Sequence, residues 1–125
     1  MEKKNEKQNN LVSKKQKNII AVIEKLLVEM HKDIQELIKF QDLEKNVDKI
    51  KEKSTRISKI CVVLQNSLDL EKGGEVATNL NHLYQHIRFA VSRVIDDNDF
   101  TYLKSAELVT AEIADGWTKV STAAA

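Results

Sequence analysis

The chain has 125 residues, 31% of them charged, with three glycines and no proline. That length suits one domain, and the shortage of turn-forming residues excludes a many-stranded sheet and favours an all-α fold. The net charge is +1, but residues 1–17 hold six lysines and two glutamates, which leaves −3 for the remainder. A mildly acidic body lacks the basic face that phosphate contacts require, so the composition excludes a nucleic-acid-binding domain.

Residues 1–16 form a lysine-rich segment that is nearly free of apolar residues apart from Leu11 and Val12. Such a segment buries too little apolar surface to offset the entropy of ordering, so we predict a disordered tail. The apolar stretch Ile19–Val28 is interrupted by two charged residues and is too short to span a bilayer, and no secretory signal is recognisable. We therefore expect a cytoplasmic protein without membrane insertion.

Apolar stripes at helical spacing then divide residues 17–121 into four predicted helices. The first helix is expected from about Gln16 to Phe40. The second is expected to start near Asp42, whose side chain is suited to cap the free amide groups of a helix. The stripe residues of these two helices are Ile23, Leu27, Met30, Ile34 and Leu37, then Val47, Ile50, Ser54, Ile57, Cys61, Leu64 and Leu68.

The second half of the chain repeats this pattern. The third helix is expected from Gly74 or Glu75 to about Ile95. The fourth is expected directly after the acidic turn, where Asp99 would cap its amide groups. The stripe residues are Val76, Leu80, Leu83, Ile87, Val91 and Val94, then Leu103, Ala106, Thr110, Ile113, Trp117 and Val120.

The sharpest turn is expected at Gly73-Gly74, between the second and third helices. Glycine adopts positive φ without steric cost, so Gly73 is expected in the left-handed position that follows a helix, with Glu75 near the positive end of the next helix dipole. Short connections make successive helices antiparallel. The predicted fold is therefore an all-α, antiparallel up-and-down four-helix bundle with a disordered N-terminal tail.

Further apolar residues lie beside the stripes, more than the roughly three positions per heptad that a bundle core uses. Two interpretations are open. Wide stripes can simply fill a compact core, or their flanks can line a groove that receives an amphipathic partner helix. The surplus residues are Val22, Leu26, Ile38, Ile60, Val63, Phe89, Ile95, Leu108 and Val109.

Residues that often carry chemistry do not form a recognisable catalytic or metal site. Cys61 is the one cysteine and lies in an apolar run, as a small buried hydrophobe does. His82 and His86 are one helical turn apart, but no third ligand completes a metal site. The acidic residues around Asn98 lack the glycine and the closing glutamate of a calcium loop. We therefore expect no enzyme activity, no cofactor and no metal.

Four short segments stand out along the chain: Leu68–Glu75, Leu80–Tyr84, Asp97–Asp99 and Asp115–Trp117. Together they resemble the FliS family, the flagellin-specific export chaperones of bacteria, and the resemblance covers about residues 20–120. It implies a four-helix bundle whose grooves hold the C-terminal segment of flagellin in an extended helical wrap and block premature filament assembly. It also implies docking of the loaded chaperone on the export gate, with Leu11 and Val12 as the comparable anchors of the tail.

The groove interpretation assigns a partner surface to the second and third helices. His86 belongs to it because it matches the second aromatic residue of the family's Leu-Tyr-x-Tyr run, here Leu83-Tyr84-Gln85-His86. Two rivals stay open: a FliS-like regulatory adaptor for another flagellar or export component, and a self-associating structural bundle. The expected state is a monomer or a weak dimer. The predicted partner-binding residues are Ile60, Val63, Leu64, Tyr84, His86, Ile87 and Val91.

Deletion of residues 1–10 tests the prediction for the tail. Because the segment offers little apolar surface to bury, the deletion should leave the midpoint of thermal unfolding nearly unchanged when it is followed by circular dichroism. A fall of several degrees would mean that the segment is docked on the bundle.

Overall fold

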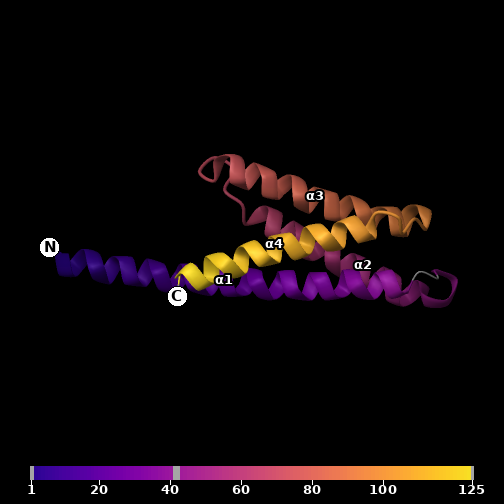
Figure 1. Cartoon of the computed structure of the whole chain (residues 1–125), viewed down its shortest axis with the longest axis horizontal. Helices are drawn as coiled ribbons and strands as arrows, with labels where there is room; N and C mark the ends of the chain where they lie inside the picture. The colour runs from indigo at the N-terminus through magenta and orange to yellow at the C-terminus, as the bar shows by residue number, and fades with distance from the viewer. Residues whose placement is uncertain (1, 41–42, 125) are drawn as a thin grey trace.

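The computed structural model describes the backbone of residues 2–40 and 43–124 and the side chains of residues 18–40 and 46–117. Four helices account for most of the chain: α1 (Glu2–Lys39), α2 (Leu43–Asn66), α3 (Gly74–Asp97) and α4 (Leu103–Ala124). Successive helices run in opposite directions, and the described backbone has no strand (Figure 1). The predicted all-α, up-and-down four-helix bundle is confirmed.

Each helix packs against two neighbours, so that the four form a ring. α1 lies mainly along α4 and α2 along α3, and the contacts of α1 with α2 and of α3 with α4 close the ring. Within the described part of the chain, neither diagonal pair of helices has its backbones in contact. Side chains from all four helices therefore fill the centre of the bundle.

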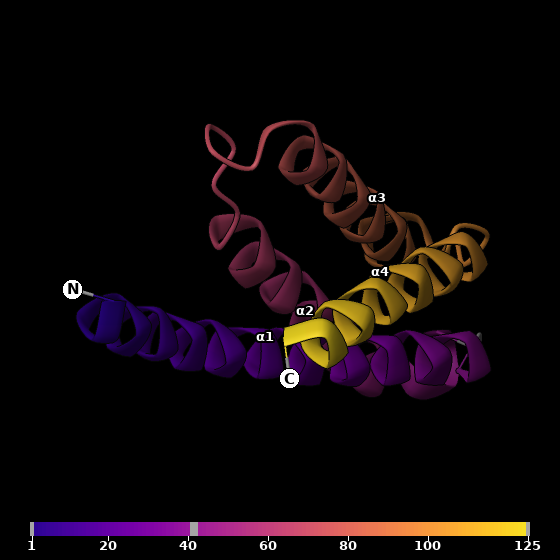
Figure 2. The ribbon, with the colours of Figure 1, turned by 60° about the vertical axis from the view of Figure 1, so that its left-hand side comes forward.

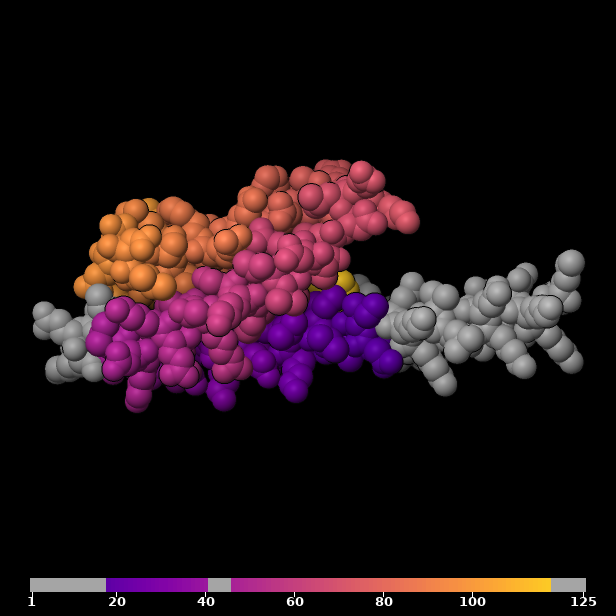
Figure 3. Space-filling model, turned by 180° about the vertical axis from the view of Figure 1, so that it is seen from behind, coloured from indigo at the N-terminus to yellow at the C-terminus, as the bar shows by residue number. Residues whose placement is uncertain are grey.

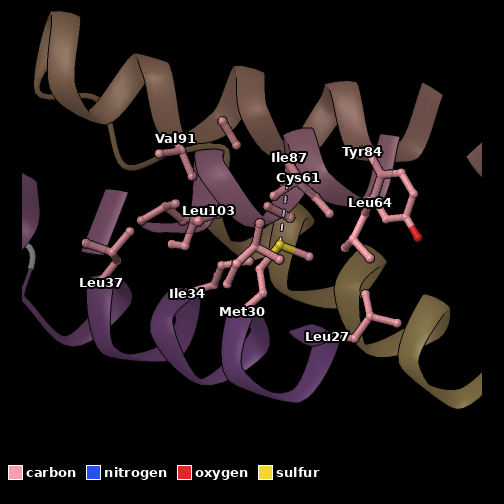
Figure 4. Close-up of a cluster of buried hydrophobic side chains, with 14 of the residues drawn as sticks. Leu27, Met30, Ile34, Leu37, Cys61, Leu64, Tyr84, Ile87, Val91 and Leu103 are labelled. Carbon is pink, nitrogen blue, oxygen red and sulfur yellow. Dashed lines mark hydrogen bonds between the residues drawn. The ribbon is translucent and has the colours of Figure 1, made fainter. Parts of the chain in front are cut away.

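Most residues of the predicted stripes are buried in the core, and off-stripe residues such as Ile60, Tyr84 and Ala90 are buried with them. Of the other stripe residues, Val47 is exposed and the side chain of Val120 lies outside the described part of the chain. Figure 4 shows aliphatic side chains of all four helices meeting around Cys61, whose thiol donates a hydrogen bond to the sulfur of Met30 at 3.5 Å. Two polar residues of the stripes, Ser54 and Thr110, are also buried, and the Thr110 hydroxyl donates to the Ala106 carbonyl one turn earlier. The largest fully buried side chains are Tyr84, Leu27, Met30, Ile34, Leu37, Ile50, Ile57, Leu64, Ile87, Leu103, Val91 and Val94.

The helix boundaries differ from prediction at two places, and a third prediction is not tested. α1 begins at Glu2 rather than near Gln16, and its first half extends beyond the bundle (Figure 1); that this segment adds little stability stays a prediction. Asp42, the expected cap of the second helix, lies outside the described residues. The prediction for Asp99 is wrong: its carboxylate accepts a hydrogen bond from the Thr101 amide at 2.9 Å inside the α3–α4 turn, and α4 starts later, at Leu103.

The α2–α3 turn also corrects the prediction for its glycines. α2 ends at Asn66, and Gly74, not Gly73, has positive φ, at +55°. Gly73 has an ordinary right-handed conformation, and its amide donates to the Asp69 carbonyl at 2.7 Å. A Cβ at Gly73 would lie 2.5 Å from Ala77 Cβ and 2.6 Å from that carbonyl oxygen. Gly74 therefore provides the positive φ that the turn requires, and Gly73 allows the close approach of Ala77 and of the Asp69 carbonyl.

Replacement of each glycine by alanine separates these roles. Gly73→Ala should destabilise the protein by about 1–3 kcal/mol through overpacking, and Gly74→Ala by about 1–2 kcal/mol through its left-handed backbone. The matched control is Gly116→Ala inside α4, where a Cβ meets nothing within 4 Å, and it should stabilise by about 0.5–1 kcal/mol. Urea unfolding measures all three. If the Gly73 and Gly116 variants were equally stable, the result would contradict the close approach of Ala77 to Gly73.

Candidate partner-binding site

The bundle is open at the end that carries the α2–α3 turn. In Figure 2 this turn stands clear of α1 and of the C-terminal half of α4. The view from behind shows it projecting from the body of the molecule (Figure 3). At this end the apolar stripes continue past the closed core, and two grooves lie between neighbouring helices.

The first groove lies between α3 and α4 and has a volume of about 380 Å³. Its most exposed apolar residue is Val76, with 70% of its surface accessible. Trp117 forms part of the other wall and packs against the core. Burial raises the pKa of the Tyr84 hydroxyl behind it, and a hydrogen bond with the Trp117 side chain partly offsets that rise. The lining residues are Val76, Leu80, Leu83, Glu112, Ile113, Gly116 and Trp117.

The second groove lies between α1 and α2 and has a volume of about 290 Å³. Val22 of α1 and Val63 of α2 are more than half exposed in it, at 58% and 55%. Its polar lining is confined to the neutral side chains Asn18 and Ser67. The remaining lining residues are Ile19, Ile23, Leu26 and Leu64.

Polar contacts join the helices where each groove ends. Between α3 and α4, His86 Nε2 lies 3.0 Å from the Ser105 hydroxyl. Between α1 and α2, Arg56 pairs with Glu29 and with the buried Asp33, each at 3.3 Å. Farther along this seam Lys53 bonds Glu36, and the bond lowers the pKa of the Glu36 carboxyl. Polar contacts thus join both helix pairs where the grooves end, and at the open end the side-chain amide of Gln65 on α2 donates to Asn81 on α3 at 3.0 Å.

The seven predicted partner-binding residues fall into three groups. Val63 is exposed and lines the α1/α2 groove, with the nearly buried Leu64 at its base. His86 is partly exposed and bonds Ser105. The other four are buried in the core and line neither groove: Ile60, Tyr84, Ile87 and Val91.

Sequence reasoning assigned several groove residues to the core. Val76, Leu80 and Leu83 belong to the third predicted stripe, yet Val76 is exposed and the two leucines are only partly buried. The sequence feature that could have indicated its exposure is the position of Val76, two residues after the glycine turn, where a stripe can extend past the end of the core. Among the surplus residues the flank interpretation holds for Val22 and Val63, whereas Ile60 is buried.

The described residues offer no alternative chemistry at the grooves. They contain no group of three or more His, Cys, Asp or Glu side chains placed to hold a metal ion. Burial raises the pKa of the Cys61 thiol to about 12, so the thiol stays protonated and makes a poor nucleophile. Among the described helices, none is long and apolar enough to cross a membrane.

Fold and grooves together define a small four-helix-bundle protein with an open apolar end. The chain belongs to the FliS family, since the sequence profile described as "Flagellar protein FliS" matches residues 1–124. It is 33% identical over 73 residues to the "Flagellar secretion chaperone FliS" of Salmonella typhimurium, covering 55% of this chain and 54% of that protein. It is 31% identical over 77 residues to the "Flagellar secretion chaperone FliSB" of Pseudomonas aeruginosa, covering 59% and 61%. The matched segments thus span little more than half of these curated relatives.

The raised pKa of Cys61 predicts how stability depends on alkaline pH. The ordinary thiol pKa is 9.0 and the folded value is about 12, so between these limits the unfolded chain loses its proton first and stability falls as pH rises. Cys61→Ala removes this dependence. The stability difference between parent and variant, from urea unfolding, should shrink by roughly 1 kcal/mol from pH 7 to pH 10. A stability difference that stays constant between these pH values would contradict the raised pKa of the Cys61 thiol.

Proposed function

We propose that this protein is a cytoplasmic export chaperone that binds the C-terminal segment of flagellin in its two apolar grooves. It acts stoichiometrically, by covering an amphipathic segment that would otherwise polymerise before export, and it performs no catalysis. The loaded complex then docks on the flagellar export gate. The observation that carries the proposal is the pair of uncovered apolar grooves at one end of the bundle, in a chain whose relatives are named flagellar secretion chaperones.

The grooves suit a helical segment because their exposed residues come from facing helix flanks. On α3, Val76, Leu80 and Leu83 follow one another at spacings of four and three. On α1, Ile19, Val22 and Leu26 repeat the same pattern. An amphipathic helix presents its own apolar residues at these spacings, so its side chains can alternate with those of the groove.

The magnitudes favour occupancy of both grooves. Full burial of an exposed valine or leucine side chain is worth about 1.5–3 kcal/mol, and association costs at least about 4 kcal/mol. Three half-exposed anchors in one groove therefore yield little net affinity. A segment that fills both grooves roughly doubles the favourable contribution but loses its translational freedom only once. This supports a long flagellin segment rather than a short peptide.

A charge placed in each groove tests the proposal. Val63→Glu in the α1/α2 groove and Val76→Glu in the α3/α4 groove should each weaken binding of a labelled flagellin C-terminal segment by more than about 2 kcal/mol, about thirty-fold. Both side chains are more than half exposed, so the fold should persist. Fluorescence anisotropy measures the affinity, and circular dichroism confirms the fold.

Matched controls place the same charge on exposed residues outside the grooves. Val62→Glu lies beside Val63 on α2, and Leu108→Glu lies on α4, and neither residue lines a groove. Both variants should bind like the parent. Groove variants that fold and bind normally would overturn the proposed site. A parent that binds no flagellin segment would favour the adaptor, and concentration-dependent sedimentation that the groove variants abolish would favour the self-associating bundle.

A further inference from the structure

The α3/α4 groove contains one charged residue, Glu112, among otherwise apolar lining. Glu112 is seven residues after Ser105, so both lie on the flank of α4 that faces α3, where Ser105 bonds His86. Its side chain is exposed. Among the residues whose side chains are described, Glu112 has neither a hydrogen bond nor an ion pair, so its charge is not neutralised there.

Three other glutamates at the helix seams have partners. Glu107, five residues earlier on α4, accepts hydrogen bonds from Lys104 and Gln35, which hold the pKa of its carboxyl below the usual range against the effect of burial. Glu29 pairs with Arg56, and Glu36 pairs with Lys53. Glu112 combines its place in the groove with the lack of a partner among the residues whose side chains are described.

The two grooves differ in charge although both are apolar. The α1/α2 groove has only the neutral side chains Asn18 and Ser67 at its polar positions. A segment with a lysine or arginine beside its apolar anchors gains an ion pair in the α3/α4 groove and none in the other. The difference can therefore fix which part of a long segment enters which groove.

We infer that Glu112 is a specificity-determining residue: the α3/α4 groove takes the part of the client helix in which a lysine or arginine flanks the apolar anchors, and Glu112 pairs with that cation. The inference rests on the proposed function, because the client is the segment that fills the grooves. It adds the chemistry that orients the client. The apolar contacts provide most of the affinity, and the ion pair selects the register.

Salt titrations of Glu112 variants test this inference. Binding of the labelled flagellin C-terminal segment is measured from 50 mM to 500 mM sodium chloride for the parent, Glu112→Gln and Glu112→Lys. Exposed ion pairs of this kind contribute little and are screened by salt, so Glu112→Gln should weaken binding about two- to five-fold at low salt and hardly at all at high salt. Glu112→Lys should weaken it further at low salt. Glu52→Gln, an exposed carboxylate of α2 outside both grooves, is the matched control and should match the parent.

The cation on the client is found with peptide variants. Each lysine or arginine of the flagellin segment is changed to glutamine in turn, and every peptide is measured against the parent and Glu112→Gln. One substitution should abolish the effect of Glu112→Gln, as expected for a direct pair. The inference is overturned if Glu112→Gln binds as the parent does at low salt, or if its effect is the same with every peptide.

The controls keep the two proposals separate. If the parent binds and Val76→Glu weakens binding but Glu112→Gln does not, only the inference on Glu112 fails. If Val76→Glu binds as tightly as the parent, the α3/α4 groove is not the site, and the inference fails with it. A parent that does not bind the segment at all overturns both.

Discussion

Burial of the aliphatic core, the central seam where side chains of all four helices meet, is the constraint on which the rest of this structure depends. The helices touch only as neighbours in a ring, so the side chains that meet at its centre must hold all four together. Met30 of α1, Cys61 of α2, Ile87 of α3 and Leu103 of α4 lie in this cluster with no exposed surface (Figure 4). A close-packed core of this kind tolerates little change in volume, because a deleted methyl group leaves a cavity that its surroundings fill only in part. It also explains why the cysteine is protonated and unreactive: the thiolate would be a charge at the centre of the seam.

The grooves follow from the same seam, because the stripes are longer than the core that they build. Between Asn66 and Gly74 the chain leaves the bundle, and the contact of Gly73 with Ala77 fixes where α3 begins. The stripe of α3 therefore starts at Val76, outside the closed core, and Ile19 of α1, at the same end of the bundle, is also largely exposed. Polar ties such as His86 with Ser105 mark where the helices come together again. The apolar surface at the open end is thus a consequence of helix length and turn position, and it needs no separate folding unit.

Most of the fold could be predicted from the sequence, since the spacing of Ile23, Leu27 and Met30 and its repeats determine helices and core alike. Helix ends were less predictable. An aspartate such as Asp99 satisfies a turn amide as well as a helix cap, and periodicity does not distinguish them. Of two adjacent glycines, only the traced backbone shows which one has positive φ. For the candidate site, the surplus residues Val22 and Val63 were recognisable, but Val76 was not, because exposure depends on where the neighbouring helix ends and the stripe alone does not contain that information.

The division between seam and grooves has a functional consequence. Val63, Val76 and Val22 contribute little to the core, so their apolar surface is available to a partner without loss of stability. Residues of the central seam, such as Ile87, are already fully buried and offer no surface to a partner. A partner helix bound as proposed would therefore add to the bundle rather than replace part of it, and its binding would not require the core to open. Apolar contact of this kind is non-directional, so by itself it does not define which way a client helix lies. A single carboxylate at the rim, Glu112, is the kind of feature that provides direction, because its interaction depends on the position of one charge.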